Sequence, residues 1–184
     1  MSEIPDVFMN ADIGLSHKRG LLGTLLDLGA ALGAIPEQLH HHAFLIYYSF
    51  IPGPWSEKGW WVIESVPPEV STRLLTEEDV AKSDFFRVVG LTEEQRQAVI
   101  LWALEHKGTP YGHFGNFQWM CSILWSWLKK LLGLPVVQYA PNCTNLVVSA
   151  FRSQGVDLAP GKPANEIWPT TDLADSQLTM PVQT

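Results

Sequence analysis

The sequence has little of three features that would each point to a particular class of protein. It carries two cysteines in 184 residues, too few for a disulfide framework, and we expect two independent thiols. Its 12 Lys and Arg stand against 19 Asp and Glu, for a net charge of −7, and because phosphate binding needs a basic surplus, we expect no nucleic-acid partner. No apolar run reaches the roughly 18 residues that a membrane-spanning helix requires.

The N-terminal stretch is acidic and lacks the basic and apolar regions of a secretory signal. We therefore expect a cytoplasmic protein, with delivery to the cell envelope by a non-classical route as the alternative. No sequence pattern indicates a cofactor, and none is expected.

Apolar residues, by contrast, are plentiful. Hydrophobic residues make up 46% of the chain and charged residues 17%, with eight Trp and eight Phe. A chain of this composition is not disordered and can build a sizeable core. The length suits one domain, which we place at residues 1–176, with residues 177–184 as a flexible tail.

Apolar spacing and turn residues predict strands and helices in segregated order. The predicted strands cover residues 42–51, 60–66 and 85–89, and the first two form a hairpin. The predicted helices cover residues 21–35, 93–107, 117–132 and 143–154. The second of these helices opens with a capping box formed by Thr92 and Gln95. This order predicts an α+β fold with a small antiparallel sheet packed against helices.

Cys143 is the candidate nucleophile because of its place at the start of a predicted helix, directly after the predicted N-cap Asn142. Unpaired backbone amides and the helix dipole there favour a thiolate over a thiol. The alternative is a buried, inert cysteine. A cysteine nucleophile needs a general base and a group that orients the base. Hairpin pairing could bring His42 and Glu64 together for these roles.

Several short motifs in this order resemble those of the papain-like superfamily in a circularly permuted arrangement, close to the bacterial YiiX-like branch of the NlpC-type cell-wall amidases. In that branch the His strand comes first and the Cys helix comes last. The stretches that carry the resemblance are His42-Ala-Phe-Leu-Ile-Tyr47, Trp61-Val-Ile-Glu-Ser65, Leu91-Thr-Glu-Glu-Gln95 through Gly108-Thr-Pro-Tyr111, Asn142-Cys-Thr-Asn-Leu-Val147 and Trp168-Pro-Thr-Thr-Asp-Leu173, with Asp12-Ile13 as the opening strand.

The resemblance implies a cysteine hydrolase of amide bonds, acting on a peptidoglycan-type peptide or another acylated amine. It implies Cys143 as nucleophile, His42 as base and Glu64 as the residue that orients the imidazole. It also implies that Tyr111 and Asn142 serve substrate binding or the oxyanion, with a packing role as the alternative for Tyr111.

Other features depart from the family pattern. Asn145 stands where the relatives carry an acidic residue, and a Trp-rich helical insertion at residues 117–135 precedes the nucleophile. The insertion contains Cys121, which lies mid-helix and is expected to be a core or interface thiol. The insertion itself either packs into the core or forms a membrane, lipid or homodimer contact.

Two alternative functions therefore remain open. One is a lipid acyltransferase or hydrolase of the lecithin:retinol acyltransferase type, whose members carry His where this chain has Glu64. The other is a non-catalytic binding module on the same fold.

Consecutive histidines at residues 40–42, with His113 as a fourth ligand, raise a metal interpretation. Neighbouring strand residues point to opposite faces, so the three cannot all converge, and we expect no metal site. His40 and His41 are expected at the solvent side or rim, and His17 and His106 at the surface.

Overall fold

In the part of the chain that the structure describes, six antiparallel strands form one sheet. The computed structural model describes residues 4, 7–17, 31, 39–50, 58–110 and 142–184. The described elements are, in chain order, β1 (Asp12–Ser16), β2 (His42–Phe50), β3 (Lys58–Val66), β4 (Glu69–Leu74), α2 (Glu77–Ala81), β5 (Ser83–Val88), α3 (Glu93–Glu105), α5 (Asn142–Arg152), the single-turn helices η1 (Ala164–Glu166) and η2 (Pro169–Ala174), and β6 (Thr179–Val182). The predicted α+β class is confirmed, with a larger sheet than expected.

The strand order is β4-β3-β2-β1-β5-β6, so the long β2–β3 hairpin lies beside β1. Along β2, Ala43 and Leu45 belong to the main core, whereas Phe44 and Ile46 belong to a second apolar cluster on the other face. Both faces of the strand are therefore covered. This explains why its sequence is a continuous apolar run rather than an alternating one.

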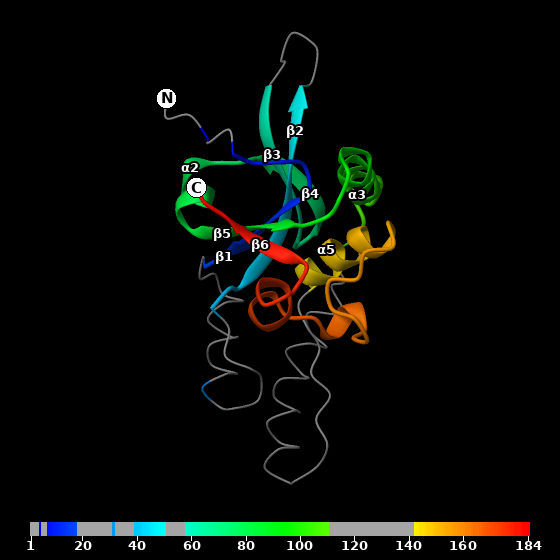
Figure 1. Cartoon of the computed structure of the whole chain (residues 1–184). Coiled ribbons are helices and arrows are strands. Elements are labelled where there is room, and N and C mark those ends of the chain that lie inside the picture. The colour runs from blue at the N-terminus through cyan, green and yellow to red at the C-terminus, as the bar shows by residue number, and fades with distance from the viewer. Residues whose placement is uncertain (1–3, 5–6, 18–30, 32–38, 51–57, 111–141) are drawn as a thin grey trace.

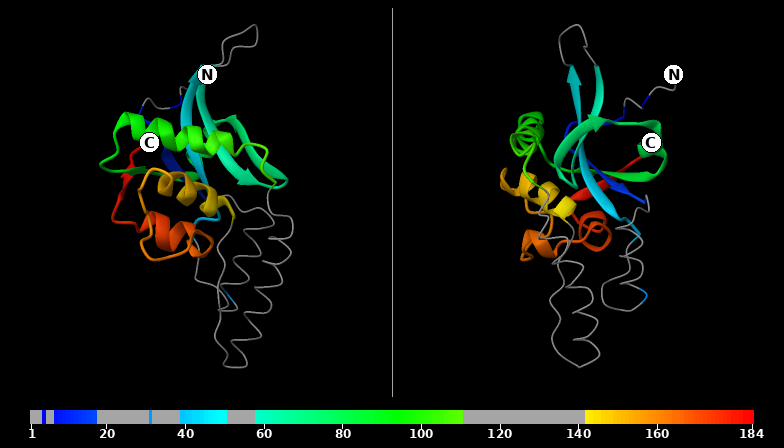
Figure 2. Two further views of the ribbon diagram at one scale, coloured as in Figure 1. Left: turned by 90° about the vertical axis from the view of Figure 1, so that its right-hand side faces the viewer. Right: turned by 180° about the vertical axis from the view of Figure 1, so that it is seen from behind.

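The helices cover the sheet unequally (Figures 1 and 2). α3 and α5 lie together on one side, where α5 packs on β2 and β3 and against α3. The short helix α2 lies on the other side, beside β5. The N-terminal end of α5 therefore comes close to the start of β2, and this placement positions the candidate nucleophile.

At Gly14 of β1, two aromatic rings from the neighbouring strands β2 and β5 pack against each other across the glycine. Gly14 is paired with Phe44 of β2 and with Phe85 of β5, and these two rings meet edge to face with centroids 6.0 Å apart. A Cβ atom at Gly14 would lie 2.2 Å from the Phe44 ring. Only glycine leaves room for the ring at this position.

The structure both confirms and corrects the predicted elements. The three predicted strands are present, and so is the capping box, in which Thr92 and Gln95 bond reciprocally. The prediction of a flexible tail at residues 177–184 is wrong at Thr179–Val182, because that segment forms β6 and pairs with β5. The predicted helix at residues 21–35, apart from residue 31, and the Trp-rich insertion at 117–135 lie outside the described residues. Among the described helices, none has the length and apolarity needed to cross a membrane.

Candidate active site

His42 and Glu64 come from neighbouring strands and meet on one face of the sheet. Glu64 is paired with Phe44, two residues along β2 from His42, so His42 and Glu64 are diagonal neighbours. The imidazole Nε2 lies 2.8 Å from the Glu64 carboxylate Oε2. The His42 side chain is 21% exposed and that of Glu64 is 7% exposed. The hairpin register thus builds the His–Glu pair that the sequence predicted.

Cys143 approaches His42 from the start of α5. It is the second residue of that helix and is 1% exposed. Its thiol interacts with the His42 side chain and with the Ala43 backbone. Because Glu64 occupies Nε2 of the imidazole, the nitrogen left for the thiol is Nδ1. His42 therefore lies between the thiol and the carboxylate.

The three groups shift one another's ionisation. Burial lowers the pKa of His42, but its interactions with Cys143 and Glu64 outweigh burial and raise that pKa to about 10. Burial raises the pKa of the Cys143 thiol, whereas the hydrogen bond and charge attraction to His42 outweigh it and bring the pKa below its usual value. Both shifts favour a thiolate–imidazolium pair.

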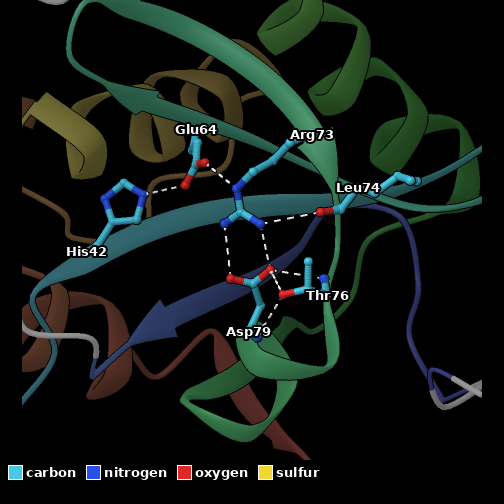
Figure 3. Close-up of polar contacts among 6 residues, drawn as sticks. All are labelled: His42, Glu64, Arg73, Leu74, Thr76 and Asp79. Carbon is cyan, nitrogen blue, oxygen red and sulfur yellow. Dashed lines mark hydrogen bonds and ion pairs between the residues drawn. The ribbon is translucent and has the colours of Figure 1, made fainter. Parts of the chain in front are cut away.

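Behind Glu64 lies a second ion pair, which the sequence analysis did not foresee (Figure 3). Arg73 of β4 donates from Nε to Glu64 Oε1 at 2.7 Å, and its two terminal nitrogens reach both oxygens of Asp79 in α2. Asp79 also completes the capping box of α2 with Thr76. Burial raises the pKa of Glu64, but the bonds to His42 and Arg73 hold it below its usual value. The carboxylate is therefore fixed in place and charged.

The comparisons with known proteins bear on the fold. No protein-family model and no curated protein matches the sequence. Among solved structures, a match is the crystal structure of the metalloprotein yiiX from Escherichia coli O157:H7, at 18% sequence identity and a TM-score of 0.53, covering 96% of this chain and 97% of that chain. The protein has a YiiX-like fold. At this identity the likeness supports the fold and carries no residue roles.

Within the YiiX-like fold, the remaining predicted site residues have different outcomes. Asn142 is the first residue of α5, so the helix begins at this residue rather than after it. The structure does not describe the Asn142 side chain. Tyr111 and Cys121 also lie outside the described residues. The Asn145 side chain accepts a hydrogen bond from Ser149 within α5. Asn145 thus makes a local helix contact.

The histidine predictions need correction in this YiiX-like fold. His40 and His41 were expected at the rim, but they are buried, at 3% and 5% exposure. Both precede β2, and the His40 ring contacts Thr170 of η2 and meets Phe86 of β5 edge to face. His17, expected at the surface, has a side chain that is 35% exposed, and its ring packs at a tilt against that of His40 with centroids 4.6 Å apart.

Proposed function

We propose that the protein is a cysteine hydrolase of the permuted papain-like type that cleaves amide bonds, in a peptidoglycan-type peptide or another acylated amine. The observation that carries the proposal is the position of the His42 imidazole between the Cys143 thiol and the Glu64 carboxylate. Nucleophile, base and orienting acceptor are the three parts that thiol acyl transfer needs.

The proposed reaction runs through an acyl-enzyme. The Cys143 thiolate attacks the amide carbonyl carbon, and protonated His42 gives its proton to the leaving amine as the C–N bond breaks. Water, activated by the now neutral His42, then cleaves the thioester and releases the carboxylic acid and the thiol. Backbone amides in the first turn of α5 have no partner within the helix and can stabilise the oxyanion.

Glu64 has a supporting role in this scheme. Its bond to Nε2 holds the imidazole with Nδ1 toward the thiol and stabilises the imidazolium. Arg73 and Asp79 keep Glu64 from rotating away.

To test this, the protein is incubated separately with muropeptides and with acyl lipids. Mass spectrometry then detects the products and any acyl adduct on Cys143. We expect amide cleavage of the muropeptides. We expect C143A to abolish it and H42A to lower the rate by about 10²–10⁴-fold. E64Q should lower the rate, whereas E78Q, a matched change at a surface carboxylate of α2, should leave it unchanged.

Two outcomes would contradict the proposal. Turnover of acyl lipids alone would favour the acyltransferase or lipase alternative. Absence of turnover and of any Cys143 adduct, together with an iodoacetamide rate at Cys143 that does not change in H42A, would favour a non-catalytic binding module.

A further inference from the structure

Two histidines and one aspartate converge where three strands meet, outside the Cys–His–Glu group. His17 directly follows β1, His40 precedes β2, and Asp84 lies in β5, next to its first residue. Because β1 lies between β2 and β5, the sheet brings the three residues to one end. The ligand-type atoms of the three side chains all lie within 4.8 Å of one another.

The carboxylate oxygen Oδ2 of Asp84 is the centre of this group. It lies 3.0 Å from Nε2 of His17 and 2.9 Å from Nε2 of His40. The backbone around it is fixed: the His17 amide donates to the Lys82 carbonyl, and the His41 amide donates to the Ser16 carbonyl. The group is therefore held by sheet hydrogen bonds rather than by a loop.

The two polar contacts of His17 are more than a neutral imidazole can satisfy. Its Nδ1 lies 3.2 Å from the Leu39 carbonyl oxygen, and its Nε2 faces the Asp84 carboxylate. Both partners only accept hydrogen bonds, and a neutral imidazole carries one N–H. A neutral ring can therefore donate to only one of these two acceptors, and the other contact is left without a hydrogen. A metal ion resolves the conflict, since a metal-bound histidine usually donates its other N–H to a carbonyl or carboxylate.

The His40 ring is held in place from inside the protein. Its side chain is 3% exposed, and its Nδ1 lies 3.2 Å from the Thr170 hydroxyl of η2. The same hydroxyl oxygen accepts hydrogen bonds from the backbone amides of Leu39 and His40. The ring is thus held with Nε2 toward Asp84.

We propose that His17 Nε2, His40 Nε2 and Asp84 Oδ2 bind one zinc-class divalent cation, with water in the fourth position. Two imidazoles and one carboxylate suit zinc and its first-row neighbours better than Mg²⁺ or Ca²⁺, which prefer all-oxygen sites. Ligand atoms of a tetrahedral zinc lie roughly 3.3 Å apart at the usual bond lengths. The Asp84 oxygen lies slightly inside that spacing from both imidazoles, at 3.0 and 2.9 Å, and its side chain, 52% exposed, has room to move outward. The two imidazole nitrogens lie within 4.8 Å of each other and would have to draw together on binding.

Such a cation would tie β1, β5 and the entry to β2 together. His40 lies two residues before His42, so the site would anchor the segment that leads into the candidate base. The proposed hydrolase does not need the metal for its chemistry, so the two proposals can fail separately.

The test is a zinc titration of the full-length protein after removal of metals with a chelator, followed by calorimetry and by the shift in thermal unfolding temperature. We expect one Zn²⁺ per chain and a higher unfolding temperature. Co²⁺ in its place should give the visible absorption of a tetrahedral site. H17A and D84N should each weaken binding by at least about tenfold. The side chains of His17 and Asp84 are 35% and 52% exposed, so both variants should fold. Circular dichroism verifies this.

Two further variants serve as controls. H106A removes a histidine that bonds the Trp102 carbonyl within α3, away from the cluster, and C143S removes the buried thiol, and both should bind zinc as the parent protein does. Absence of stoichiometric binding would overturn the proposal. So would binding that persists unchanged in H17A and D84N, or that disappears in C143S.

Discussion

The thiol of Cys143 and the imidazole of His42 stabilise each other's charged forms, and this has a measurable pH signature. The pKa of Cys143 lies below its usual value and that of His42 is raised to about 10. Since the thiolate is the reactive form, the rate of iodoacetamide labelling at Cys143 should be nearly constant from neutral to mildly alkaline pH. It should fall only as acid protonates the thiolate.

The control for this prediction is H42A. Without the imidazolium, burial still raises the pKa of the thiol, and only the hydrogen bonds with the Ala43 backbone and the Thr144 side chain oppose it. The labelling curve of H42A should therefore move to higher pH. A parent curve that rises through the ordinary thiol range of about 8.5 and coincides with that of H42A would contradict the ion pair.

Arg73 is a positioning residue in this arrangement, because it reaches the reacting groups only through Glu64. R73M removes charged hydrogen bonds to Glu64 and Asp79. We expect the free energy of unfolding in urea to fall by about 1–2 kcal/mol, at the low end for charged hydrogen bonds since the arginine is 39% exposed.

The readout that separates positioning from stability is the pH curve of Cys143 labelling in folded R73M. It should shift toward that of H42A as Glu64 loses its anchor. K82M, which breaks only the exposed Lys82–Glu78 pair, should change stability by at most about 0.5 kcal/mol and leave the curve in place. Equal labelling curves for R73M and the parent protein would show that Arg73 is structural only.

At the scale of elements, the tight crossing over β1 gives the sharpest stability prediction. G14A places a methyl group 2.2 Å from the Phe44 ring, and the ring is fully buried against Phe85. Overpacking of this kind costs about 1–3 kcal/mol, which urea unfolding measures. G59A is the matched control in another strand, since its methyl group would meet Leu74 at an ordinary 3.8 Å. Similar unfolding midpoints for both variants would contradict the close packing.

The elements that the sequence predicted are those with strong local signals. The apolar run of β2 and the capping box of α3 needed no knowledge of the rest of the chain. β4 and β6 have weaker signals: β4 is a partly exposed edge strand, and β6 contains Pro181, which strands tolerate mainly at edges. They become strands through their pairing with β3 and β5, and this pairing cannot be predicted from the local sequence.

In the candidate site, too, some residues could be predicted from local sequence and others could not. Cys143, His42 and Glu64 could be selected because a helix start and a hairpin restrict where their side chains lie. Arg73 could not, because its bond to Glu64 depends on the register between β3 and β4. The meeting of His17 with Asp84, 67 residues apart, depends on β1 lying between β2 and β5. The spacing of residues in the sequence does not predict such a strand order.

For the whole molecule, the carboxylates behind His42 predict loss of stability in acid. The pKa values of Glu64 and Asp79 lie below the usual 4.5 and 3.8. Bonds to His42 and Arg73 outweigh burial at Glu64, and bonds to Arg73 and Thr76 outweigh it at Asp79. The unfolded chain therefore binds protons that the folded chain does not, and stability is lost as the pH falls below about 5 toward the folded values. Urea midpoints measured from pH 7 to pH 3 should fall steeply for the parent protein and less steeply for R73M, whose Glu64 and Asp79 have lost their shared cation. Parallel profiles would mean that other carboxylates govern acid unfolding.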